Sequence, residues 1–230
     1  MQTQDRPFNL SHNPVPEYLH TPLYNNSSVV QCDADDCDAD FVEGGWAAAQ
    51  WIQHVRSRFQ LLLKRLATSF DGSIYGMNFL ETAIDVREDE NDFHAEDYLN
   101  GTLANAFFAR SVFTQSYVVQ YINFGPDDWA NSSGYLTVSF AFLAAHDIGV
   151  GGPDDVPFHP AQEKNPYPFM DRFRDMLPIS VIAVQEPDLE VINPKTNETF
   201  TREEFTDFAI EDLGVDIIFW ALSAPWLNGS

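Results

Sequence analysis

Two glutamates stand where long apolar segments of the sequence end. Glu81 ends SIYGMNFLE, which is apolar on both faces of a strand, and Glu186 ends LPISVIAVQE in the same way. Two carboxyl groups that face one pocket can hydrolyse a glycosidic bond. One is protonated and assists the leaving oxygen, while the other is charged and attacks the anomeric carbon or activates water. We therefore predict that Glu81 and Glu186 are a catalytic pair.

Amide, aromatic and acidic side chains occur at or near the ends of the same predicted strands. Aromatic rings pack against the C–H side of a sugar ring, and amides bond to its hydroxyl groups. We therefore predict a carbohydrate substrate. The candidate substrate-binding residues are Asn78, Tyr121, Asn123, Asp154, His159 and Trp220.

Motifs of several other chemistries are missing from the sequence. The six histidines show no H-E-x-x-H spacing, so no catalytic metal is predicted. The chain also has no G-x-S-x-G elbow, P-loop or G-x-G-x-x-G motif, and we predict no cofactor. A phosphate or acyl hydrolase that uses Asp154 with His159 is a third hypothesis, although no cationic cluster for phosphate is visible.

Helical and strand-like segments alternate along most of the chain. Residues 1–45 are rich in Pro, Asn, Ser and Asp and are predicted to be an irregular acidic segment. Residues 46–230 form the predicted barrel-like domain. Its expected helices are 46–69, 95–110, 133–146, 169–176 and 201–214, the last with a capping box at Thr201. The expected strands are 73–81, 115–124, the GVGGPD segment, 177–186 and 215–222.

This alternation predicts the α/β class with a parallel sheet. In such folds the carboxyl ends of the strands and the loops after them form the binding face, because side chains can converge there. Glu81 and Glu186 should therefore lie at one rim.

The order of strands resembles the clan of (β/α)8 TIM-barrel glycoside hydrolases with catalytic glutamates on strands four and seven. If Glu81 ends strand four, Glu186 ends strand seven and Trp220 lies on strand eight, where the clan carries an aromatic beneath the sugar. The resemblance implies that Glu81 is the acid/base, that Glu186 is the nucleophile, and that the last five parallel strands are present.

Two features depart from the clan's pattern. Leu80 stands where the clan has Asn before its acid/base. The four repeats between Glu81 and Trp220 take about 35 residues each, so eight need about 280, more than the 230 of this chain. We therefore expect either the C-terminal part of a longer chain or an incomplete and reorganised barrel, and we favour the first. The alternative hypothesis is a non-catalytic carbohydrate-binding or interaction protein on a degenerate barrel.

The charge of the chain bears on its partners. Its 35 acidic residues against 12 Lys and Arg give a net charge of −23, which makes nucleic acid and anionic membranes poor partners. We see no signal peptide and no apolar run of about 18 residues, so the chain is expected to be soluble. Its two cysteines, Cys32 and Cys37, do not fix the compartment, and the oligomeric state is open.

Overall fold

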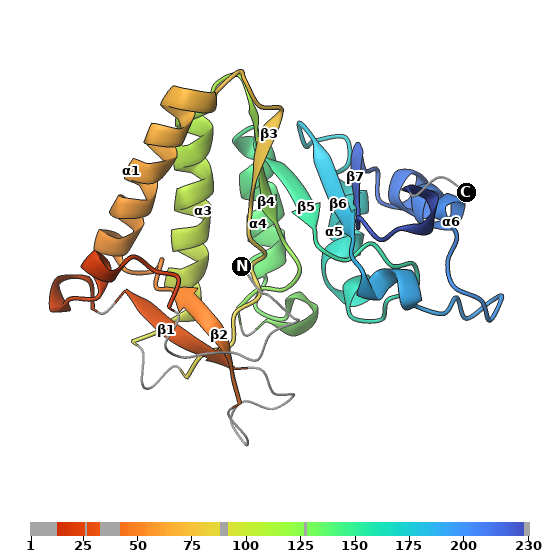
Figure 1. Ribbon diagram of the computed structural model, residues 1–230, viewed down its shortest axis with the longest axis horizontal. Helices are drawn as coiled ribbons and strands as arrows, with labels where there is room; N and C mark the ends of the chain where they lie inside the picture. Colours follow the sequence, from red (N-terminus) through yellow and green to blue (C-terminus); the bar gives the residue numbers. More distant parts are fainter. Residues whose placement is uncertain (1–12, 26, 33–41, 88–91, 127, 228–230) are drawn as a thin grey trace.

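The computed structural model describes residues 13–25, 27–32, 42–87, 92–126 and 128–227 (Figure 1). Its main sheet has five parallel strands, each paired with the next one along the chain. They are β3 (Gly76–Phe79), β4 (Tyr117–Tyr121), β5 (Gly149–Gly152), β6 (Ser180–Val184) and β7 (Ile217–Trp220). The strands curl into a half-barrel, which confirms the predicted α/β fold with five recognisable parallel strands.

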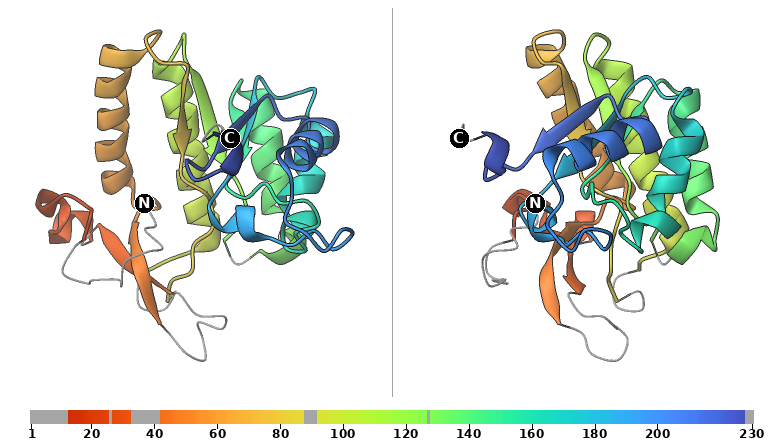
Figure 2. Two further views of the ribbon diagram at one scale, coloured as in Figure 1. Left: turned by 45° about the vertical axis from the view of Figure 1, so that its right-hand side comes forward. Right: turned by 90° about the vertical axis from the view of Figure 1, so that its right-hand side faces the viewer.

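Helices cover the convex face of this sheet (Figures 1 and 2). They are α1 (Gln53–Phe70), α3 (Ala95–Val112), α4 (Tyr135–Ala145), α5 (Pro166–Phe173) and α6 (Arg202–Asp207), which a π-helical turn (Phe208–Asp212) continues. The predicted capping box is confirmed, because Thr201 and Glu204 exchange hydrogen bonds at the start of α6.

The main hydrophobic core lies between the helices and the convex face of the sheet. Strand residues Val118, Val150 and Ile182 alternate with residues of the opposite face and pack against helix residues such as Phe140 and Leu143. Burial of this apolar surface is the principal force that holds the helices on the sheet.

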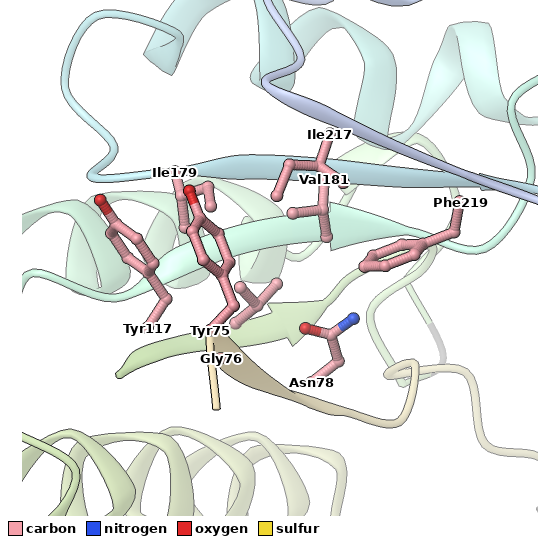
Figure 3. A pocket seen from close by; sticks show the side chains of 9 residues that line it. Tyr75, Gly76, Asn78, Tyr117, Ile179, Val181, Ile217 and Phe219 are labelled. Atoms are coloured by element: carbon pink, nitrogen blue, oxygen red, sulfur yellow. The ribbon is translucent and has the colours of Figure 1, made fainter. Parts of the chain in front are cut away.

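The concave face of the half-barrel carries a second, smaller apolar cluster, formed by Val119, Ile179 and Val181. Figure 3 shows Ile179, Val181, Ile217 and Phe219 projecting from neighbouring strands into a hollow of about 300 Å³. No helix covers this side in the part of the chain that the structure describes (Figure 2).

One predicted helix begins later than expected. We predicted a helix from residue 46, but Trp46 belongs to β2 (Glu43–Ala48), which pairs antiparallel with β1 (Ser28–Cys32). Pairing with β1 satisfies the backbone groups here, so the helix α1 begins only at Gln53. Part of the segment predicted to be irregular is therefore a strand.

The two cysteines lie at and beyond the end of β1. Cys32 is disulfide-bonded. Cys37, the other cysteine of the sequence, lies outside the described residues.

Asp71, which follows the last turn of α1, connects two loops at the amino ends of β3 and β4. Its carboxylate accepts hydrogen bonds from the backbone N–H groups of Thr114, Gln115 and Ser116 and from the Thr114 hydroxyl. Partial burial works against ionisation, but the N–H groups of Gln115, Ser116 and Thr114 hold the pKa of Asp71 well below its ordinary value.

We predict that Asp71→Asn lowers the thermal unfolding midpoint by a few degrees at neutral pH, because the amide cannot replace a carboxylate that accepts from several donors. The stabilising effect of Asp71 should be present above the ordinary Asp pKa and should be lost as pH falls below it. The control is Asp147→Asn, which removes the same charge from an exposed pair with Arg110 and should change the midpoint little. Equal shifts for both variants would contradict this role of Asp71.

No helix in the described part of the chain is both long and apolar enough to span a bilayer.

Candidate functional site

A large pocket opens at the carboxyl end of β3. Its volume is about 860 Å³, within the range of small-molecule sites. The walls come from α1, from the carboxyl ends of β3 and β4, from α3 and from the N-terminal segment. Apolar side chains form one side of the pocket: Phe59, Leu62, Phe79, Leu80 and Ile84.

Glu81 is the one acidic residue that lines this pocket. The Asn123 side chain donates a hydrogen bond from Nδ2 to Oε2 of Glu81. Asn123 is itself fixed, because its Oδ1 accepts from the backbone N–H groups of Ala83 and Phe124. Burial raises the pKa of Glu81, and the nearby carboxylate of Asp154 raises it further. The site therefore favours the protonated form of Glu81.

Polar side chains from α3 and from the loop before α1 line the pocket as a connected network. Gln50 donates from Nε2 to the Thr102 hydroxyl at 2.9 Å and accepts from Asn105 Nδ2 at 3.2 Å. Tyr98 also bonds to Gln50 and Thr102, and burial raises the pKa of Tyr98 to about 12. This part of the wall is uncharged and held in place by its own hydrogen bonds.

Amides from the strand ends supply hydrogen-bond acceptors. Gln120 donates from Nε2 to the backbone oxygens of Leu80 and Tyr121. Gln185 donates from Nε2 to the backbone oxygen of Pro153 at 2.9 Å. Within the described residues neither side-chain carbonyl oxygen has a donor partner, so both can accept a bond from a ligand.

Two of the predicted binding residues, Asn78 and Tyr121, line the pocket. Their side chains point from the concave faces of β3 and β4 and are joined by a hydrogen bond of 3.2 Å from Asn78 Nδ2 to the Tyr121 hydroxyl. Both are therefore placed where a ligand would contact them.

Asp154 and His159 lie beside the pocket and do not line it. Asp154 accepts hydrogen bonds from Gln162 at 2.9 Å and from Gln185 at 3.1 Å. Burial raises the pKa of Asp154, and the adjacent His159 partly offsets that effect. Asp154 thus holds Gln185 in position and acts on Glu81 through its charge.

The second predicted catalytic residue, Glu186, does not line the pocket with Glu81. Its side chain is exposed, and Oε1 accepts a bond of 3.4 Å from Ser223. Val181 is on the concave face, and by the period of two along a strand Gln185 lies on the same side. Glu186 has left the strand and adopts a helical backbone conformation at the start of the 3-10 turn Pro187–Glu190.

Trp220 is also placed away from the concave face. It packs in a cluster with Phe205 and Trp226, with a ring separation of 5.0 Å to Trp226. Phe219, its neighbour on β7, is the residue that faces the hollow (Figure 3). Trp220 therefore stabilises the packing of α6 on the sheet and does not stack beneath a ligand in either pocket.

Several residues that line the pocket are not among the predicted site residues. Gln185 and Gln120 sit at or next to strand ends, and the alternation of strand faces could have found Gln185. Gln50, Thr102 and Asn105 come from a loop and a helix, and no local pattern marks them, because only the tertiary packing brings them to the strand ends.

A second group of buried carboxyls lies behind this rim. Asp155 is fully buried, and neither of its carboxyl oxygens has a hydrogen-bond partner among the described residues. Burial and, to a smaller extent, the nearby carboxylate of Asp188 together raise the pKa of Asp155 to about 8. Burial likewise raises the pKa of Asp188 to about 7. No group of three or more His, Cys, Asp or Glu residues in the described segments is arranged to hold a metal ion.

Comparison with known proteins returns little. No protein-family model and no curated protein sequence matches the chain. Among solved structures, an old yellow enzyme homologue from Zymomonas mobilis is similar, with 14% sequence identity and a TM-score of 0.47. The match covers 85% of this chain and 56% of that one, so the chain spans little more than half the length of this neighbour.

The prediction of a glycoside hydrolase is contradicted. Glu186, the second carboxyl that the prediction requires, lies outside the Glu81 pocket, so the two carboxyl groups do not face one site. The half-barrel of parallel strands remains. A carbohydrate partner stays a prediction that these findings do not test.

Proposed function

We propose that the protein binds a small, hydroxyl-bearing organic molecule with an apolar body, and that Glu81 is its principal polar partner. The observation that carries the proposal is a single carboxyl group with a raised pKa inside a pocket of about 860 Å³, whose other lining residues are amides, hydroxyls, apolar side chains and two arginines. Both arginines already have partners, because Arg56 donates to the backbone oxygen of Gln50 and Arg58 to the Tyr24 hydroxyl. Such a mixture of apolar walls and a few convergent polar groups is typical of ligand sites.

The hydrogen-bonding groups of the pocket fit a hydroxyl group, which both donates and accepts. The side-chain carbonyl oxygens of Gln120 and Gln185 can accept a hydrogen bond from the O–H of the ligand. Glu81 accepts from Asn123 at Oε2, so a protonated Oε1 can donate to the hydroxyl oxygen. The apolar body would lie against Phe59 and Leu62 of α1.

The test uses cyclohexanediol, benzyl alcohol, glucose and glycerol as probes and measures saturation-transfer NMR on the full chain. The ring compounds should bind and glycerol should not, because glycerol has no apolar body. Gln185→Ala and Glu81→Ala should weaken binding, whereas Glu190→Gln, which changes an exposed carboxyl on the 3-10 turn after β6, should not. Binding of a probe that is unchanged in both pocket variants would place the ligand elsewhere and refute the proposal.

Affinity should depend on pH through Glu81. Because the raised pKa keeps Glu81 protonated further up the pH scale, binding should be strongest below that pKa and should weaken by about tenfold as pH rises through it and the donor is lost. Titration calorimetry across a pH series would measure this change. Glu81→Gln keeps a neutral donor at every pH and should show a flat profile; a pH response that persists in this variant would assign the effect to another group.

A further inference from the structure

The exposed face of α1 is chemically unlike the rest of the chain. Its 18 residues contain four of the 12 Lys and Arg of the protein and no Asp or Glu. The remaining eight cations of the chain are set against 35 acidic residues. One basic helix in so acidic a protein is not needed for solubility, which the net charge of −23 already favours.

The basic and apolar side chains of α1 form one stripe. His54, Arg58, Leu61 and Arg65 follow one another at steps of four, three and four residues and therefore share one side of the helix. All four are exposed, and Leu61 keeps 48% of its surface in solvent. Leu62 beside them keeps 51%. The opposite side, with Leu63 and Ala67, packs toward α3. Val55 packs against the N-terminal segment at Val15, Leu19 and Tyr24.

The protein itself does not neutralise this stripe. Within the described residues, neither Lys64 nor Arg65 has an ion-pair or hydrogen-bond partner, and Arg58 uses only Nε, to the Tyr24 hydroxyl at 2.9 Å. Figures 1 and 2 show α1 as the outermost helix of the layer, with α3 on one side. The N-terminal segment contacts the stripe at Arg58 through Tyr24, whereas Leu61 and Arg65 stay exposed.

We propose that this face of α1 is a docking surface for an acidic amphipathic helix of a partner protein. Carboxylates of the partner would pair with Arg58 and Arg65, and its apolar residues would cover Leu61 and Leu62. The stripe residues repeat every three or four positions, and this is the spacing at which side chains of one helix pack along another helix. A second copy of this chain is a poor occupant, because two copies of charge −23 repel and their α1 helices would bring like charges together.

The same charge argument separates this partner from larger anionic surfaces. A nucleic acid or an anionic membrane would meet the acidic remainder of the molecule as well as α1, whereas a short helix contacts the stripe alone. Arg58 of the stripe and the adjacent Leu62 also line the Glu81 pocket, whereas Leu61 and Arg65 do not, so variants of Leu61 and Arg65 test the stripe without altering the lining of the pocket.

The probe is a fluorescently labelled peptide of three heptads with Leu at the two core positions and Glu at the surface positions. A matched peptide carries Gln in place of Glu. Fluorescence anisotropy with the full chain should show saturable binding of the Glu peptide that weakens at high salt, and little binding of the Gln peptide. Arg65→Glu and Leu61→Ser should each weaken binding by about tenfold.

The control is Arg202→Glu, which makes the same charge reversal at the exposed first turn of α6 and should leave binding unchanged. Circular dichroism checks that each variant stays folded, and Arg65→Gln offers a milder change should Arg65→Glu unfold. Equal binding of the two peptides, or binding unaffected by Arg65→Glu, would overturn the proposal. So would binding to phosphatidylserine vesicles without binding of the peptide, or a dimer of this chain that Arg65→Glu dissociates.

Discussion

At alkaline pH the Asp155→Asn variant is expected to be more stable than the unmodified protein. Asp155 is fully buried with both carboxyl oxygens unpartnered among the described residues, so its ionised form is strongly disfavoured in the folded state. An unfolded chain exposes Asp155 to water and lets it ionise near its ordinary pKa of 3.8. Ionisation therefore favours unfolding, and an amide at this position removes that effect.

The direction in which stability changes with pH follows from the raised pKa of Asp155. The folded state favours the neutral carboxyl of Asp155. The contribution of Asp155 to the free energy of unfolding is therefore most favourable below its ordinary pKa, and it declines as pH rises toward about 8. A tenfold difference in proton affinity corresponds to about 1.4 kcal/mol, so the decline amounts to several kcal/mol. Urea unfolding between about pH 5 and pH 9 measures it.

The groups around Asp155 favour the protonated form of its carboxyl group. Asp188 approaches it, and its own Oδ2 accepts from the backbone N–H of Gln185 at 2.6 Å. The Tyr167 hydroxyl donates to the backbone oxygens of Asp154 and Val156 and is not a donor to Asp155. No cation reaches the Asp155 oxygens among the described residues, so a proton is the available means of neutralising them.

A control separates this effect from general charge repulsion. The net charge of −23 by itself makes the protein less stable as more acids ionise, and any Asp→Asn change relieves some of that repulsion. Asp175→Asn removes one charge from an exposed position and should leave the slope of stability against pH nearly unchanged. A slope in Asp155→Asn equal to that in Asp175→Asn would show that Asp155 is not the group responsible.

The parallel sheet was predictable because its signals are local. Each strand is a short apolar run bounded by polar or glycine-rich turns, and each is followed by a helical period, which together specify a parallel α/β sheet. The order of β3 to β7 then follows from chain order. The start of α1 was not predictable in this way, since Trp46 pairs with Val30 of β1, a contact across the hairpin that periodicity does not reveal.

The site was predicted only in part for a similar reason. Glu81 lies at a pocket because it follows the carboxyl end of β3, which is a local feature of the sequence, and its catalytic role stays a prediction. To place Glu186, one must know on which side of the sheet each side chain lies at the end of β6. A shift of one residue along a strand reverses that side. Gln185 therefore occupies the place that we assigned to its neighbour.

The second large effect is expected from Gly149 on β5. A Cβ atom added there would lie 2.7 Å from the backbone oxygen and 2.5 Å from Cγ2 of Ile179 on the neighbouring strand, and 3.1 Å from a methyl group of Val119. A backbone oxygen held in the sheet cannot move aside without loss of pairing between β5 and β6. Gly149→Ala should therefore destabilise the protein by about 3 kcal/mol, the upper end of typical overpacking costs.

Gly152→Ala provides the matched control on the same strand. A Cβ at Gly152 would meet nothing closer than 3.8 Å, to the side chain of Ile182, and Gly152 is likewise buried. The two variants add the same methyl group, so the difference between their unfolding free energies reports the close approach of β5 to its neighbours. If Gly149→Ala were no less stable than Gly152→Ala, the strands would not be packed as closely as we describe, and the concave surface that carries Tyr121 and Val181 would be differently shaped.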